Sequence, residues 1–181
     1  MTDLLCSQHG WLGHVFVHEA AHAVAAAQRR IPFAEVRILQ PDNWMAAHDG
    51  TMLGGVRLEN DAQVWVRAEP VAALEFVLAG AFAERAAFGH CLMGAHRGDL
   101  DVWRIGAGLT AAQHLERIEA FLGRPFDVVT SDVERWVADN YPSIRRVAGA
   151  LAGVGDLAEA VLLSFSDDWR LSEAEVLALL A

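Results

Sequence analysis

The chain has 181 residues, 54 % hydrophobic and 21 % charged, which is enough apolar material for one folded domain and excludes an intrinsically disordered protein. The formal net charge is −10, and all 14 basic residues are arginines. An acidic surface repels phosphate groups, so we expect neither nucleic-acid binding nor docking on an anionic membrane. Without lysine, a Walker-type ATP site is also excluded, because its phosphate-binding loop requires one.

The two cysteines, Cys6 and Cys91, lie far apart and form no C-x-x-C pair, which is typical of a reducing compartment. The N-terminal residues do not read as a signal peptide. The most apolar stretch, 71–88, contains charged residues and is too short to cross a bilayer. We therefore expect a cytoplasmic protein whose residues 1–181 form a single domain.

The first part of the chain predicts one helix followed by a small sheet. Apolar residues recur at helical spacing over 11–30, and this segment ends in two arginines before Pro32. Two segments with strand-forming residues, 35–39 and 51–58, flank a turn-rich stretch. We expect these segments to form two short antiparallel strands.

The remainder of the chain predicts helices. Pro70 and Gly89 are typical of a helix start and a helix end, so we expect a helix over 70–88. Capping-box patterns at 131–134 and 172–175 predict two further helix starts. The sequence thus predicts a mainly α fold with a small β element near the N-terminus. The other expected helices cover 99–122, 131–141, 142–151, 156–165 and 172–180.

Residues 18–22 read H-E-A-A-H in the middle of the first expected helix. Because positions i and i+4 share one helix face, His18 and His22 can bind one Zn²⁺. Glu19 can then take a proton from the metal-bound water and return it to the leaving amine. The alternative is a pair of core histidines beside a solvated glutamate. We disfavour it, because an ionised carboxylate on a buried, alanine-rich helix needs a partner.

A catalytic zinc usually has a third protein ligand, and the spacing of residues does not identify it. The residues after the motif, 28–30, lack the glycine and histidine of the metzincin extension. His14 lies four residues before His18, and we expect it to pack between helices rather than to bind metal. The candidates for the third ligand are His48, Glu75, Glu84, His90, His96, Asp99 and Asp101.

The motif resembles the H-E-A-G-H-A helix of the FtsH-type ATP-dependent zinc metalloproteases. Residues 35–41 resemble the strand that follows in that peptidase domain, and 78–84 resemble its L-G-G-R-A-A-E segment. Residues 94–100 resemble its G-A-S-N-D-L segment with one residue inserted, and the C-terminal helices resemble its closing helices more weakly. The resemblance covers nearly the whole chain. It implies a zincin-like helical metallopeptidase domain acting on peptides or unfolded proteins.

The resemblance also implies roles for individual residues. His18 and His22 match the zinc histidines, Glu19 the catalytic glutamate, and Asp99 the aspartate that is the third ligand. Glu84 matches an acid that would accept a hydrogen bond from a ligand imidazole. From the residues alone, a helix-surface carboxylate or one paired with Arg85 is an equally good interpretation of Glu84.

The chain departs from the family in several ways. The glycine of H-E-A-G-H is Ala21, the arginine of L-G-G-R is Ala81, and the inserted residue before Asp99 can displace that ligand. The family's ATPase module and membrane anchor have no counterpart here. We therefore expect a zinc metalloendopeptidase that needs no ATP as an isolated chain, with a homo-oligomer or a separate ATPase partner left open.

Two other classes of protein stay open. One is a non-catalytic, metal-binding interaction module derived from the same fold, and the other is a helical structural protein with a chance motif. For the peptidase, we expect an extended substrate to pair with the edge of the small sheet near Val36 or Val56.

Overall fold

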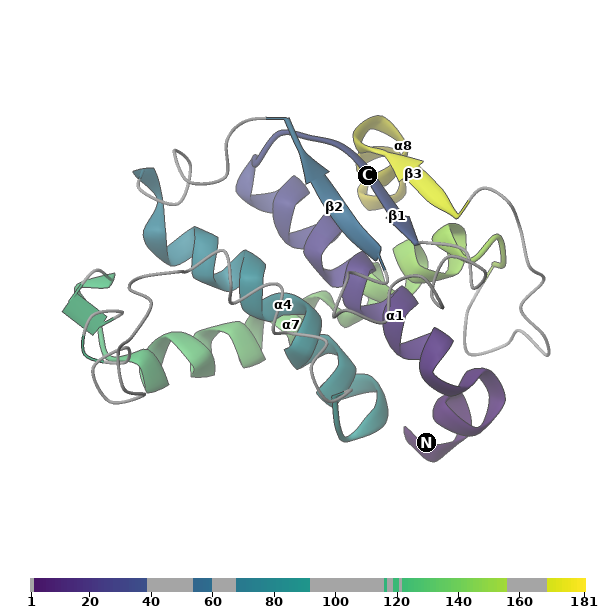
Figure 1. Cartoon of the computed structure of the whole chain (residues 1–181), viewed down its shortest axis with the longest axis horizontal. Helices are drawn as coiled ribbons and strands as arrows, with labels where there is room; N and C mark the ends of the chain where they lie inside the picture. The colour runs from purple at the N-terminus through teal and green to yellow at the C-terminus, as the bar shows by residue number, and fades with distance from the viewer. Residues whose placement is uncertain are drawn as a thin grey trace, which may run out of the picture.

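The computed structural model describes residues 2–38, 54–59, 68–91, 116, 119–120, 122–155 and 169–181 (Figure 1). Within these residues the fold is mainly helical with a small antiparallel sheet, as the sequence predicts. None of the helices in this part of the chain has an apolar stretch long enough to cross a membrane. The helices are α1 (Thr2–Arg29), α4 (Pro70–Phe88), α7 (Phe126–Leu151) and α8 (Glu173–Leu180), and the strands are β1 (Phe33–Ile38), β2 (Gly54–Leu58) and β3 (Arg170–Ser172).

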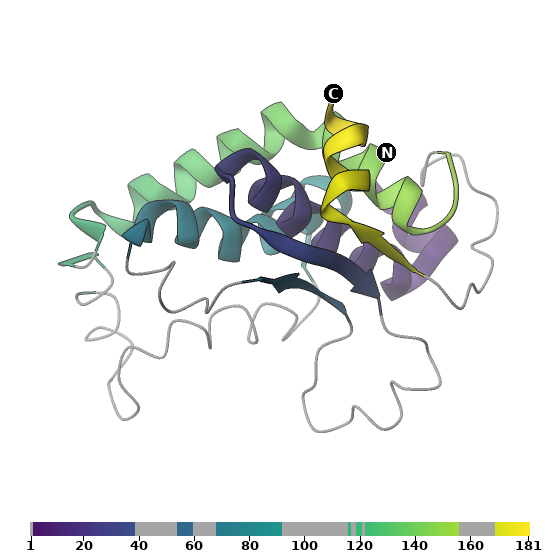
Figure 2. The same cartoon turned by 90° about the horizontal axis from the view of Figure 1, so that it is seen from above.

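Helix α1 is the centre of the molecule. It contacts α4, α7 and α8 as well as β1 and β2. Figure 2 shows α7 and the sheet on opposite sides of α1. Most of its alanines, including Ala20, Ala21 and Ala23, are fully buried, because their small side chains let neighbouring elements approach the helix closely. The helix begins at Thr2, earlier than expected, since no proline interrupts the segment before residue 11.

The sheet has the order β2-β1-β3, and both pairings are antiparallel. Two of its strands agree with the prediction, whereas β3 was not expected, because three residues are too few to show an alternating pattern. Val36 pairs with Val56 on one side and with Leu171 on the other. The expectation that a substrate pairs beside Val36 is therefore wrong, since β1 is the central strand. Among the described residues, β2 is paired on one side only.

Helix α4 has the predicted bounds. Pro70 stands in its first turn, where its missing N–H costs no hydrogen bond. Gly89 follows the last turn with φ of 77°, a left-handed conformation that favours glycine, and its N–H donates to the carbonyl oxygen of Arg85. These two local signals fix both ends of the helix that carries Glu84.

Helix α7 is one helix, not the two that Pro142 predicts. Buried apolar residues continue at helical spacing on both sides of the proline, at Val133 and Val137 before it and at Ile144 after it. Packing of this stripe outweighs the lost backbone hydrogen bond. The expected helix start at Ser131 is also wrong, because its hydroxyl donates to the carbonyl oxygen of Asp127 inside the helix.

The second capping box is confirmed at the start of α8. The Ser172 hydroxyl oxygen accepts the N–H of Glu175, and the Glu175 carboxylate accepts the N–H of Ser172 in return. The hydrogen bonds from Ser172 lower the pKa of Glu175. The expected helix over 156–165 and most of that over 99–122 lie outside the described residues.

Candidate metal centre

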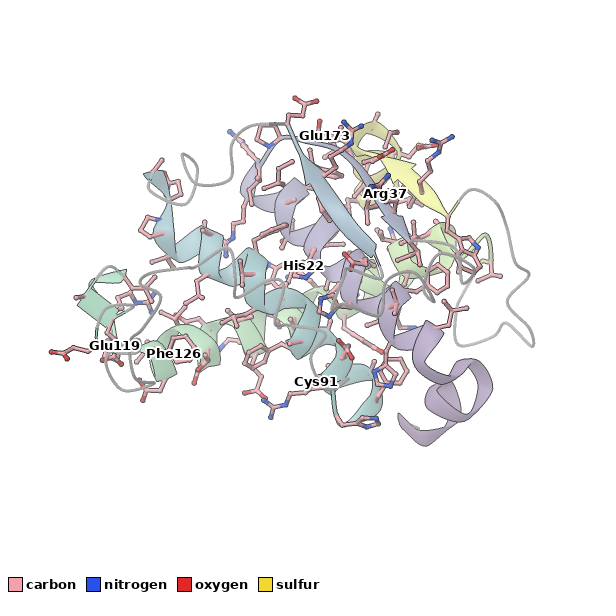
Figure 3. The ribbon with its side chains drawn as sticks, in the orientation of Figure 1. His22, Arg37, Cys91, Glu119, Phe126 and Glu173 are labelled. Carbon is pink, nitrogen blue, oxygen red and sulfur yellow. The ribbon has the colours of Figure 1, made fainter. Side chains whose placement is uncertain are left out.

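The three motif residues lie on α1 where it meets α4, and Figure 3 shows His22 at this crossing. All three are buried, with exposed fractions of 5 % for His18, 8 % for Glu19 and 4 % for His22. The two imidazole rings lie edge to face with their centroids 4.7 Å apart, and their Nε2 atoms are 3.0 Å apart. The i, i+4 spacing thus brings one nitrogen of each ring to a common point.

The other ring nitrogens determine which tautomers are present. Nδ1 of His22 lies 2.7 Å from the carbonyl oxygen of Phe76 in α4, and a carbonyl oxygen can only accept a hydrogen bond. Nδ1 of His18 lies 2.7 Å from Oε1 of Glu84, and an ionised carboxylate likewise only accepts. Nδ1 of His22 therefore carries a proton, and Nδ1 of His18 carries one when Glu84 is ionised. In a neutral imidazole this leaves Nε2 as an acceptor.

Two acceptor nitrogens that face each other at this distance repel, unless a cation lies close to both lone pairs. Tetrahedral zinc with Zn–N distances of about 2.0–2.1 Å holds two ligand nitrogens about 3.3–3.4 Å apart. The observed 3.0 Å is a few tenths of an ångström shorter. The two Nε2 atoms therefore fit a zinc ion as ligands, since an acceptor at Nδ1 fixes the orientation of each ring.

Glu84 lies on α4 and is fully buried, so it is not a surface carboxylate. Its Oε1 accepts from Nδ1 of His18, and its Oε2 accepts from Nδ1 of His14 at 2.8 Å. The neighbouring Arg85 points elsewhere, with its guanidinium carbon 5.4 Å from the centre of the Phe82 ring. Glu84 thus makes the contact that the resemblance implies, to an imidazole of the motif.

His14 makes more contacts than the sequence predicts. It packs between helices as expected, fully buried and with its ring stacked on Phe88 at a centroid distance of 3.8 Å. In addition, it donates to Glu84, and its spacing of four residues from His18 was the available signal. Burial lowers the pKa of His14 more than the hydrogen bond and the charge of Glu84 raise it, so the ring is neutral at neutral pH.

Two glycines make room for the motif side chains. A Cβ atom at Gly80 in α4 would lie 2.6 Å from the ring of His18, and one at Gly54 in β2 would lie 2.8 Å from Cγ of Glu19. Gly80 therefore allows α4 to approach the imidazole closely. A glycine inside an otherwise helical segment was the sequence signal for this contact.

Replacing Gly80 with alanine is expected to displace the His18 ring and to weaken zinc binding about 10- to 100-fold, the usual cost of disturbing the support of a ligand. The measurement is the zinc dissociation constant by competition with a chromophoric chelator, with far-UV circular dichroism to establish that the variant is folded. An alanine variant that binds zinc as tightly as the parent chain would show that zinc binding does not depend on the space that Gly80 leaves for the His18 ring.

The other candidates for the third ligand fall into two groups. Glu75 forms an ion pair with Arg29 at 2.7 Å, and burial raises the pKa of its carboxyl. His90 is exposed, and its Nδ1 donates to the carbonyl oxygen of Phe88. In the described ranges, no group of three or more histidine, cysteine, aspartate or glutamate side chains is placed to hold a metal ion. The residues that lie outside those ranges are His48, His96, Asp99 and Asp101.

Comparison with known proteins adds no assignment. No protein-family model matches the chain, no curated protein matches it, and no solved structure matches its fold. The candidate site therefore depends on its own geometry, beside the motif resemblance described above.

Proposed function

We propose that the chain is a zincin-like zinc metallopeptidase, in which His18 and His22 hold the metal and Glu19 is the general base. The observation that carries this proposal is the pair of Nε2 atoms 3.0 Å apart, each belonging to a ring whose Nδ1 proton is held by an acceptor on α4. Two buried acceptor nitrogens in this arrangement can bind one cation together, and imidazole nitrogens are preferred zinc ligands.

Charge supports the same proposal. Glu84 is a fully buried carboxylate that accepts from His14 and from His18, and positive charge nearby stabilises a buried negative charge. A divalent cation on Nε2 of His18 would lie one ring away from Glu84. A proton shared by His18 and His22 is the other way to place positive charge there, and metal analysis separates these two cases.

Glu19 supplies the acid–base chemistry in this proposal. It follows His18 directly in the sequence, and its Cγ lies close to the first residue of β2, as the contact at Gly54 indicates. Zinc bound by the two rings would make a water ligand acidic and polarise the scissile carbonyl. Glu19 takes the proton from the attacking water and delivers it to the leaving amine. Asp99 remains the proposed third ligand, on the strength of the resemblance alone.

The sheet offers an edge along which an extended substrate can bind. Strand β2 begins beside Glu19 and is paired on one side only among the described residues, so its outer edge runs away from the catalytic carboxylate. An extended peptide that adds to this edge near Val56 by backbone hydrogen bonds passes Glu19 at one end. Such pairing reads the backbone rather than side chains, which suits peptides and unfolded proteins of varied sequence.

The second candidate is a metal-binding module of the same fold without peptidase activity. The residue inserted before Asp99 and the replacement of the family's arginine by Ala81 favour it, because both change the surroundings of the proposed site.

Cleavage of unfolded casein and of a mixed peptide library, with and without 1,10-phenanthroline, tests the proposed function. We expect hydrolysis that the chelator abolishes, that added Zn²⁺ restores, and that ATP does not change. A zinc-loaded chain that cleaves nothing in either substrate set would favour the non-catalytic module. Stimulation of this chain alone by ATP would contradict the expected ATP independence.

A further inference from the structure

A third histidine shares the helix face that carries the proposed zinc ligands. His14, His18 and His22 follow one another at intervals of four residues on α1, so they form a row facing α4. His14 is too far along this row to share a metal with His22, and no described group of three ligands includes it. The contacts of His14 therefore indicate a role other than that of a metal ligand.

His14 touches the carboxylate that holds His18. The two oxygens of Glu84 are divided between the two rings, with Oε2 accepting from His14 at 2.8 Å and Oε1 from His18 at 2.7 Å. A carboxylate with one donor can still rotate about its terminal bond, whereas one donor on each oxygen fixes the plane of the group. Both donors come from one rigid helix, which also fixes their spacing.

The ring of His14 is itself held in place. It is fully buried, stacks on Phe88 with an interplanar angle of 25°, and lies against His90 with a centroid distance of 5.0 Å. Its Nε2 has no hydrogen-bond partner among the described residues. Desolvating this nitrogen has a cost, and rotation of the ring would remove the bond to Glu84.

We propose that His14 is a positioning residue, which fixes Glu84 and through it the orientation and tautomer of His18. This inference rests on the proposed zinc site, because its expected effect is tighter metal binding. Hydrogen-bonded supports of ligand imidazoles contribute about 10- to 100-fold to metal affinity. The contact with Glu84, in contrast, exists whether or not metal is bound.

Two variants of His14 separate positioning from packing. In His14→Asn, the amide nitrogen stands near the place of Nδ1 and can still donate to Glu84, whereas His14→Leu fills the space without a donor. We expect His14→Leu to bind zinc about 10- to 100-fold more weakly than the parent. The asparagine variant should stay much closer to the parent. If both variants are equally weak, or if the leucine variant binds like the parent, the inference fails.

A double-mutant cycle tests whether His14 acts through Glu84. Adding His14→Leu to a chain that already carries Glu84→Gln should weaken zinc binding little further, since the carboxylate that His14 orients is gone. Additive losses would overturn the inference.

Imidazole ¹⁵N spectra of the metal-free parent keep this inference distinct from the proposed function. We expect His14, His18 and His22 all to carry the proton on Nδ1. In His14→Leu, the His18 ring should lose its single tautomer, while in His14→Asn it should keep it. A proton on Nε2 of His14, or a His18 tautomer unchanged in His14→Leu, would refute the positioning role. A parent chain that binds no zinc would refute the proposed function alone.

Discussion

Replacing Glu19 with glutamine is expected to lower kcat for peptide hydrolysis by about 10²- to 10⁴-fold, the usual contribution of a general base. Glutamine keeps the size of the side chain, so its place beside Gly54 at the start of β2 is preserved. It cannot accept the proton of the attacking water. Because Glu19 is a base and not a ligand in this account, the variant should keep its zinc. The measurements are kcat on one peptide that the parent cleaves and zinc content by mass spectrometry.

Glu35→Gln is the matched control. It makes the same chemical change at a carboxylate on β1 that pairs with Arg57 at 3.2 Å, and it should leave both kcat and zinc content near the parent values. Loss of zinc in Glu19→Gln would mean that this residue is a ligand. Retained hydrolysis would mean that another group takes the proton.

Replacing Asp99 with asparagine is expected to leave the protein zinc-poor and inactive, because loss of a ligand removes most of the zinc affinity. Asp101 is the matched control. The two residues stand two positions apart at the start of one predicted helix, so their side chains point about 200° from each other and only one can face the histidine pair. Asp101→Asn should cost only about 0.3–1 kcal/mol of stability, from the helix dipole. Zinc titration and hydrolysis of both variants measure the difference.

The reverse result would show that the inserted residue shifts the register and makes Asp101 the ligand. Zinc retained by both variants would exclude both aspartates and favour His90 or His96. Glu84 would be a poor substitute, since each of its oxygens already accepts a hydrogen bond from a histidine.

The bounds of α4 could be predicted because Pro70 and Gly89 act on the backbone next to them. The continuity of α7 could not, because it results from the packing of a stripe on both sides of Pro142, and packing partners are not visible in a local pattern. Strand β3 exists only through its pairing with β1, from the opposite end of the chain. Local signals thus predicted both ends of α4 and the start of α8, but not the tertiary contacts.

The candidate site shows the same division. The face shared by His18 and His22 follows from helix geometry, so the motif alone predicted it. The acceptor for Nδ1 of His22 is a backbone carbonyl, which every residue has, so nothing in the sequence distinguishes Phe76. The spacing of four residues between His14 and His18 is visible in the sequence. That His14 donates to Glu84 is not, because this contact depends on how α4 packs against α1.

In the proposed metal centre, the Nε2 atoms of His18 and His22 bind one zinc ion. The most direct test strips the purified chain with a chelator, titrates it with Zn²⁺ and measures the metal bound per folded chain, beside His22→Leu under the same conditions. We expect about one zinc per parent chain and little or none in a folded His22→Leu. A folded parent chain that takes up no zinc, or a His22→Leu variant that binds as much as the parent, would contradict it.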